Sequence, residues 1–216
     1  MMLTRKEIDG LDKLYRINLI NSVTGIKPAN LIGTKSVDGF ENLAIISSVV
    51  HMGSNPPLLG FIMRPSGEVR RDTYENIKDQ NLYTMNQVPR GLAENAHYTS
   101  AKFDREVSEF DRCNFTPEYL GDFPIPFVKE SPIKIGLKLV EEIPIQANGT
   151  ILIIGNIELL QVQDHAVNQV GQIDLEALHA VGISGLNTYY ELKKKVEMPY
   201  ARVNELPDWN DSKKQG

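Results

Sequence analysis

Short apolar segments separated by turn residues fill the first part of the chain, and this pattern limits the folds that it can adopt. The apolar segments 17–23, 29–36 and 40–52 alternate with turns at 25–28 and at Asp38-Gly39. Asp-Gly between two apolar segments favours a tight hairpin, because both residue types tolerate the positive φ that such a turn needs. The pattern predicts a meander of antiparallel strands.

Later segments repeat this pattern. Residues 58–63 form an apolar run of strand length after the strand-ending Asn55-Pro56-Pro57, and 82–88 is a further strand candidate. Two long segments, 133–145 and 150–162, flank an Asn-Gly turn and predict a long hairpin. We therefore expect six or seven strands that are joined mostly by short turns.

Two helices have clear start signals. Thr4 and Glu7 have the spacing of a capping box, which opens a short helix toward Tyr15. Asp72 is a suitable N-cap for a second helix over residues 73–80. The second helix follows the strand-rich region, so it is expected to pack against the sheet.

The remaining segments complete a single domain over residues 1–216. Residues 90–125 have helical spacing and form a helical insertion, 174–180 is interpreted as a last short helix, and 203–216 as a tail with Trp209 as an aromatic anchor. The segment 182–192 gives no clear signal. The fold class that we predict is mainly β with helical additions, arranged as a small Greek-key β-barrel.

Charge and cysteine content exclude several classes of partner. The net charge is -5 and the pI is about 5.4, without the basic patch that nucleic-acid binding requires. Cys113 is the single cysteine, which excludes an intramolecular disulfide and a zinc site made of several thiolates. No apolar stretch reaches the roughly 18 residues of a membrane span, so we expect a cytoplasmic protein that does not insert into membranes.

Several catalytic motifs are absent from the sequence. No two glycines have the G-x-G spacing of a dinucleotide-binding loop, and no Gly-Lys pair marks a P-loop. The four histidines are far apart, and neither H-E-x-x-H nor G-x-S-x-G occurs. Zinc and serine hydrolases are therefore disfavoured, and no metal ligand is predicted.

Small polar residues and an arginine gather in the strand-rich region. They are Thr34, Ser36, Asn42, Ser47, Ser48, Arg64, Thr73 and Asn76. Thr34 and Ser36 end one predicted strand and Ser47 lies on its hairpin partner, so these hydroxyls can face one ligand. A helix start at Thr73 beside Arg64 suits a phosphate, because free N–H groups and a guanidinium both favour an anion. Each residue alone also has a structural explanation; their convergence indicates a ligand.

The same region resembles a known family. In order, it contains Gly33-Thr34, Asp38-Gly39, Asn42-Leu43-Ala44, Ser47-Ser48, Asn55-Pro56-Pro57, Met63-Arg64-Pro65 and Arg71-Asp72-Thr73-Tyr74-Glu75-Asn76-Ile77. Over roughly the first 90 residues, this order and spacing resemble the signature of the flavin reductase-like FMN-binding split-barrel family, which includes flavoredoxin-like proteins. The resemblance implies a split β-barrel of the FMN-binding type.

The resemblance also implies which end of FMN each residue contacts. Thr34, Asn42 and Ala44 would lie by the flavin ring, Ser47 and Ser48 nearer the ribityl chain and phosphate, and Arg64, Thr73 and Asn76 at the phosphate end. Members of the family are typically homodimers with each flavin at the subunit interface. A second copy of the chain is therefore the expected partner.

The reaction is likewise implied by the resemblance. It would be an NAD(P)H-dependent flavin oxidoreductase that passes electrons through FMN to a small-molecule or protein acceptor, with FAD as a further substrate. No catalytic side chain is assigned, because hydride transfer to a flavin depends on positioning. Two alternatives stay open, an FMN-binding electron carrier without reductase activity and a ligand-free barrel that serves as an interaction module. Tyr189, Tyr190 and Trp209 could stack on the ring or act as core or dimer contacts.

Overall fold

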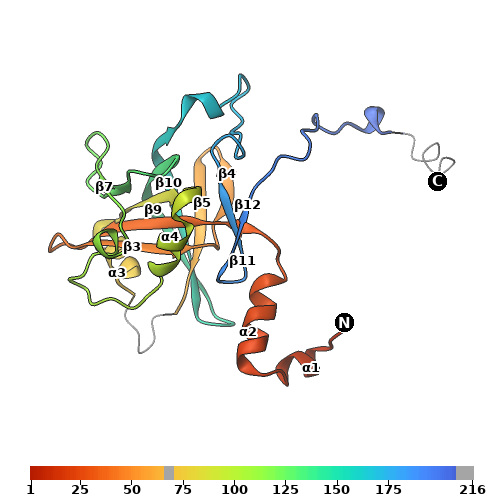
Figure 1. Ribbon diagram of the computed structural model, residues 1–216, viewed down its shortest axis with the longest axis horizontal. Helices are drawn as coiled ribbons and strands as arrows, with labels where there is room; N and C mark the ends of the chain where they lie inside the picture. The colour runs from red at the N-terminus through yellow and green to blue at the C-terminus, as the bar shows by residue number, and fades with distance from the viewer. Residues whose placement is uncertain (66–70, 208–216) are drawn as a thin grey trace.

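A seven-stranded antiparallel sheet forms the centre of the computed structural model, which describes residues 1–65 and 71–207 (Figure 1). The strand order is β3-β2-β6-β9-β10-β5-β4. The bounds are β2 Asn30–Lys35, β3 Glu41–Ile46, β4 Val50–Ser54, β5 Pro57–Met63, β6 Leu82–Gln87, β9 Ile133–Ile145 and β10 Thr150–Val162. The predicted fold class, mainly β with helical additions, is confirmed.

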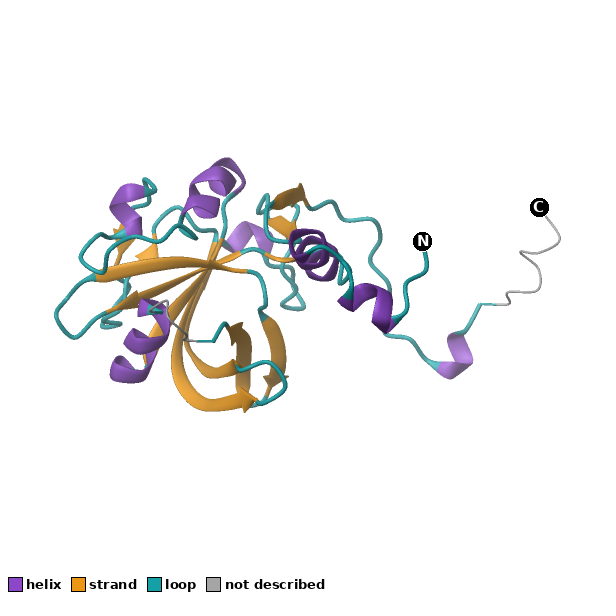
Figure 2. Cartoon of the chain, turned by 90° about the horizontal axis from the view of Figure 1, so that it is seen from below, coloured by secondary structure: helices purple, strands orange, loops and turns teal. Residues whose placement is uncertain are grey.

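The two edge strands of this sheet, β3 and β4, follow each other in the chain. Residues 47–49 alone separate them, so the first and last strands of the sheet are neighbours in the chain, and Figure 2 shows that the sheet is strongly curled. At the junction the Ser48 hydroxyl accepts a hydrogen bond from the Ile62 N–H and donates one to the Ile62 carbonyl, each at 3.1 Å. A side chain thus bridges the gap that backbone pairing leaves open, and the result is the split barrel that the sequence predicts.

Side chains alternate between the two faces of the curled sheet and build two apolar clusters. The inner cluster consists of Ile32, Phe61, Met63, Ile77, Tyr83, Met85, Leu137 and Ile153. The outer cluster consists of Ala29, Leu31, Leu43, Val88, Ala96, Phe110, Cys113, Phe115, Val128, Val181 and Ile183. Helix α3 (Asp72–Gln80) joins the inner cluster through Ile77, while the 90–125 segment packs against the outer one.

Shorter elements surround the sheet. A three-stranded sheet contains β1 Lys27–Pro28, β11 Val181–Ser184 and β12 Thr188–Glu191, and β7 Pro117–Glu118 pairs with β8 Phe127–Val128. The other helices are α1 Arg5–Asp9, α2 Lys13–Ser22, α4 Ala93–Tyr98 and α5 Glu109–Arg112, with 3-10 turns at Arg90–Leu92, Asp164–Ala166 and Val203–Glu205. Within the described residues, no helix is long and apolar enough to cross a membrane.

The long hairpin of β9 and β10 has the predicted bounds, residue for residue. Its register shifts twice, because Val140 on β9 and Glu158 on β10 have no direct partner on the other strand. Such β-bulges bend a strand and increase its twist. They therefore help the two 13-residue strands to follow the curl of the barrel.

The prediction of a strand over residues 17–23 is wrong, because this segment lies in α2 and its C-cap. The Asp12 carboxylate accepts hydrogen bonds from the backbone N–H groups of Leu14 and Tyr15 and so starts a helix upstream of the apolar run. None of the α2 residues is buried. The predicted capping box at Thr4 is confirmed, but its helix ends at Asp9 and does not continue toward Tyr15.

Three further predictions need correction. The segment 40–52 contains two strands rather than one, because the chain leaves the sheet at residues 47–49. Asp72 is the first residue of α3, and Arg71 occupies the N-cap position. Residues 174–180 form turns instead of a helix, since the chain reverses at His179, whose φ is 50°.

The predicted hairpin at Asp38-Gly39 is confirmed, but its turn is longer than the sequence suggests. The loop spans residues 36–40, and the Gly39 N–H donates to the Ser36 carbonyl at 3.0 Å. Gly39 has a φ of 95°, whereas Asp38 has no positive φ. A two-residue primed turn would need positive φ at both positions.

Trp209 and the rest of 208–216 lie outside the described residues, so the predicted tail is described only up to 207. The single domain over the whole chain stays a prediction.

Tyr83 is an unusual residue of the inner cluster. Its ring packs edge-to-face on Phe61 with the ring centres 5.7 Å apart, and its hydroxyl lacks a hydrogen-bond partner among the described residues. Burial raises the pKa of this phenol. Gly155 provides the space, since a Cβ atom there would lie 2.2 Å from the hydroxyl oxygen.

We expect Tyr83→Phe to increase the free energy of unfolding by about 1 kcal/mol, because a buried hydroxyl without a partner costs about 1–3 kcal/mol of desolvation. Urea denaturation measures this change. A variant that is about 1 kcal/mol less stable would mean that the hydroxyl has a partner in solution.

Candidate functional site

Four of the predicted site residues form one hydrogen-bond network at the end of the barrel beside α3. The Thr73 hydroxyl donates to the Asn42 side-chain oxygen at 2.8 Å, and the Thr34 hydroxyl donates to the same oxygen at 3.2 Å. The Asn76 amide in turn donates to the Thr34 hydroxyl at 3.1 Å. Strands β2 and β3 and helix α3 are therefore linked by polar side chains at this point.

Glu109 completes the network, and sequence reasoning missed it. This residue opens α5 in the 90–125 segment, and its carboxylate accepts hydrogen bonds from the Asn42 amide and the Leu43 backbone N–H, both at 2.9 Å. Thr99 plays a similar role nearby, since its hydroxyl accepts the Ile45 N–H at 2.9 Å. The only signal in the sequence is an acidic residue inside an otherwise unassigned helical segment.

Burial of Glu109 affects its charge. The residue is 7% exposed, and this burial raises the pKa of its carboxyl, while the hydrogen bonds from Leu43 and Asn42 act in the opposite direction. A buried carboxylate is tolerated because its lone pairs receive N–H donors.

The network changes how the predicted site residues can act. Thr34, Thr73 and Asn76 are 0%, 7% and 3% exposed, so they offer little surface to a ligand. Asn42 is half-buried and keeps more accessible surface. Asn42 was expected at the ring end of FMN and Thr73 at the phosphate end, but the structure brings the two into direct contact.

Ser36 and Ala44 lie on either side of this network along the β2–β3 hairpin. The Ser36 hydroxyl accepts a hydrogen bond from the Phe40 N–H at 3.1 Å, and Ser36 is 3% exposed. It therefore supports the hairpin loop. Ala44 is half-buried on β3 and pairs with Ile32 of β2, which places it on the same face of the strand as Asn42.

Ser47, Ser48 and Arg64 lie where the barrel is split. The Ser48 hydroxyl is engaged with Ile62, two residues before Arg64, so the serine pair lies close to the end of β5. Ser47 is half-buried, and its hydroxyl bonds to no other residue within 1–65 and 71–207. Arg64 is exposed and forms no ion pair in the same ranges. These two side chains are available to a ligand.

Arg71 is a second arginine that the predicted site did not include. It is the N-cap residue of α3, and its Nε atom is buried without a hydrogen-bond partner in the described part of the chain. A buried guanidinium nitrogen beside a helix N-terminus suits an anion. Arg71 thus fits the phosphate end of the predicted site.

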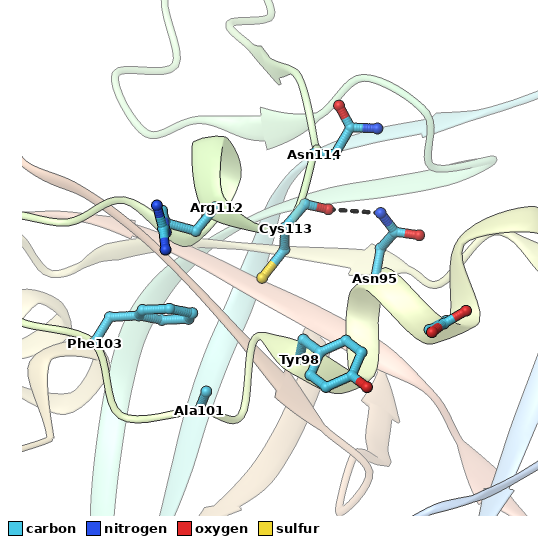
Figure 3. Close-up of a pocket in the computed structure, with 8 residues that line it drawn as sticks. Asn95, Tyr98, Ala101, Phe103, Arg112, Cys113 and Asn114 are labelled. Atoms are coloured by element: carbon cyan, nitrogen blue, oxygen red, sulfur yellow. Dashed lines mark hydrogen bonds between the residues drawn. The ribbon is translucent and has the colours of Figure 1, made fainter.

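A separate pocket of about 450 Å³ lies in the 90–125 segment (Figure 3). Its lining residues are Glu94, Asn95, Tyr98, Ala101, Phe103, Arg112, Cys113 and Asn114. Burial raises the pKa of the Cys113 thiol, which agrees with an unreactive cysteine. None of the predicted site residues lines this pocket, nor the one of about 550 Å³ between residues 129–134 and 160–164.

The two aromatic candidates in the described part of the chain, Tyr189 and Tyr190, make no hydrogen bond to the network. Tyr189 on β12 packs edge-to-face on His97 of α4, with its hydroxyl 3.4 Å from Nδ1, and burial raises the pKa of Tyr189 to about 12. Tyr190 is exposed. Tyr189 therefore serves to dock the β11–β12 hairpin on the 90–125 segment. Among the described residues, no group of three or more His, Cys, Asp or Glu could hold a metal ion.

Glu109→Gln should change how stability depends on pH. Because the pKa of Glu109 is raised in the folded state, its contribution to stability is complete below the unfolded pKa and is lost as pH rises through the folded pKa. The stability of the wild type relative to Glu109→Gln should therefore fall as the pH rises from about 4, close to the ordinary glutamate pKa, toward neutrality. Urea denaturation across this range measures it, with Thr99→Val as a control that adds no such trend. A difference that grows with pH would contradict the raised pKa.

Comparisons with known proteins identify the family. The model of the flavin reductase like domain matches residues 26–177. A candidate flavin reductase with a split barrel domain from Shewanella frigidimarina NCIMB 400 is 48% identical, with a TM-score of 0.89 over 93% of this chain and 100% of its own. The fold is shared with nitrilotriacetate monooxygenase component B from Bacillus cereus, which is 20% identical with a TM-score of 0.81 over 92% of this chain and 98% of its own. It is also shared with an FMN-binding protein from Thermus thermophilus, which is 16% identical with a TM-score of 0.68 over 82% of this chain and 93% of its own. The chain belongs to the flavin reductase-like domain family.

Proposed function

We propose that this protein binds FMN and acts as an NAD(P)H-dependent flavin oxidoreductase, as a cytoplasmic homodimer with the flavin at the subunit interface. The observation that carries the proposal is the set of uncommitted polar groups at the split of the barrel, in a chain of the flavin reductase-like family. Ser47 and Arg64 lie there, and Arg71 caps helix α3, whose Thr73 bonds to Asn42 of the polar network.

The residues present fit the chemistry of FMN. Arg64 and the buried Nε of Arg71 would hold the phosphate, together with the N-terminal end of α3, because cationic donors and the helix dipole both favour an anion. Ser47 would add a hydroxyl near the ribityl chain. Asn42 and Ala44 would lie by the ring, where a small side chain leaves room for a flat ligand.

When bound, the flavin supplies the redox chemistry, since its ring accepts hydride from a reduced nicotinamide. The side chains of this protein then act by holding and orienting the ligand, and no acid or base is required of them. Electrons would pass to a small-molecule or protein acceptor, and FAD would serve as a further substrate.

Arg64→Ala should weaken FMN binding about tenfold, because the substitution removes a charge-assisted hydrogen bond to the phosphate. Riboflavin, which lacks the phosphate, should bind the variant as well as it binds the wild type. Quenching of flavin fluorescence measures both affinities. Arg112→Ala, an exposed arginine of the separate pocket, is the matched control and should bind FMN normally. An equal loss of affinity for FMN and for riboflavin would show that Arg64 does not contact the phosphate.

The reaction itself is tested by absorbance. The purified protein should show a flavin spectrum or acquire one on titration with FMN, and it should oxidise NADH or NADPH with FMN or FAD as acceptor. Flavin binding without oxidation of either nucleotide would favour the electron carrier. A protein that gains no flavin absorbance would favour the alternative function, a ligand-free barrel that serves as an interaction module.

A further inference from the structure

Asn42 occupies a special place in the polar network. Of the five side chains that form it, the other four are buried, while Asn42 is half-buried. One of its two amide N–H groups donates to Glu109, and the second bonds to no other residue in the described part of the chain. Asn42 therefore combines an accessible position with an uncommitted donor.

The orientation of this amide is determined by its neighbours. An ionised carboxylate only accepts hydrogen bonds, so the amide nitrogen of Asn42 must face Glu109. The amide oxygen then faces the hydroxyls of Thr34 and Thr73, which both donate to it. The hydrogens of these two hydroxyls are thus committed inside the protein, so the threonines support Asn42 and do not supply donors to a ligand.

We propose that Glu109 is a positioning residue of the flavin site, which orients the Asn42 carboxamide so that its free N–H can donate to a carbonyl oxygen of the flavin ring. The inference rests on the function proposed above and deepens it. It assigns Asn42 and Glu109 to the ring end of the site, whereas Arg64 and Arg71 belong to the phosphate end.

The opposite orientation of the amide shows why Glu109 matters. If the Asn42 amide turned over, its nitrogen would face the two threonine hydroxyls and its oxygen would face the ligand. The free group would then be an acceptor, and a carbonyl oxygen has no hydrogen to donate to it. The Leu43 N–H donates to the same oxygen as Asn42, so a glutamine at position 109 could keep its own amide oxygen there, whereas a leucine offers no acceptor and selects neither orientation.

A double-mutant cycle on the full-length protein tests this role. Glu109→Leu should weaken binding of both FMN and riboflavin about tenfold, because the free donor is no longer held toward the ring carbonyl. Asn42→Ala should weaken binding at least as much. The double variant should bind no more weakly than Asn42→Ala, since Glu109 acts through Asn42.

Thr99→Val provides a matched structural control. It removes a side-chain contact to the same edge strand from the same 90–125 segment, but it does not touch Asn42. Its flavin affinities should stay within about twofold of the wild type. An equal loss in Thr99→Val would show that Glu109 merely docks the segment, and would overturn the proposal.

Other outcomes are equally decisive. Additive losses in the double variant, or a loss for FMN without one for riboflavin, would also overturn the proposal. Normal flavin binding by Glu109→Leu would overturn this inference alone and leave the proposed function intact. A wild-type protein that binds neither FMN nor riboflavin would instead refute the proposed function.

Discussion

Backbone groups at the edges of the curled sheet need hydrogen-bond partners, and side chains supply them. The N–H groups of Leu43 and Ile45 on β3 donate to side chains of the 90–125 segment, and the N–H of Ile62 donates to Ser48 at the split of the barrel. Without such partners an edge strand would carry unpaired polar groups and could pair with another chain. The contacts of Leu43 and Ile45 also hold the 90–125 segment on the barrel.

One of these edge contacts also shapes the candidate site. The Glu109 carboxylate binds a backbone N–H and the Asn42 amide with the same oxygen atom. Glu109 therefore pairs with the edge of the sheet and also determines which way the Asn42 amide points in the network between β2, β3 and α3. Loss of the carboxylate should therefore affect both the stability of the fold and the binding of flavin. Loss of the Thr99 hydroxyl removes a contact to the same strand without touching Asn42, so it separates the two effects.

Local patterns predicted the parts of this fold that local interactions determine. The long hairpin has the expected bounds, α3 begins one residue before the expected helix, and the motif residues Thr34, Asn42, Thr73 and Asn76 meet in space. Their partner Glu109 lies 66 residues from Leu43, a separation at which sequence spacing carries no information about contact. The segment 17–23 was misread because an exposed apolar run has the same composition as a strand, and only the cap at Asp12 distinguishes them.

The two bulges of the long hairpin compensate each other. Val140 moves the pairing of β9 and β10 by one residue, and Glu158 moves it back, so that the pairing beyond Leu159 is again in phase with the pairing at the turn. Removal of one bulge residue alone would turn the side chains on the far side of that bulge from the turn to the opposite face, and in β9 these include Leu137. Removal of both bulge residues would keep the register of the two strands and the face to which each side chain points. Homologous hairpins should therefore change length on both strands together.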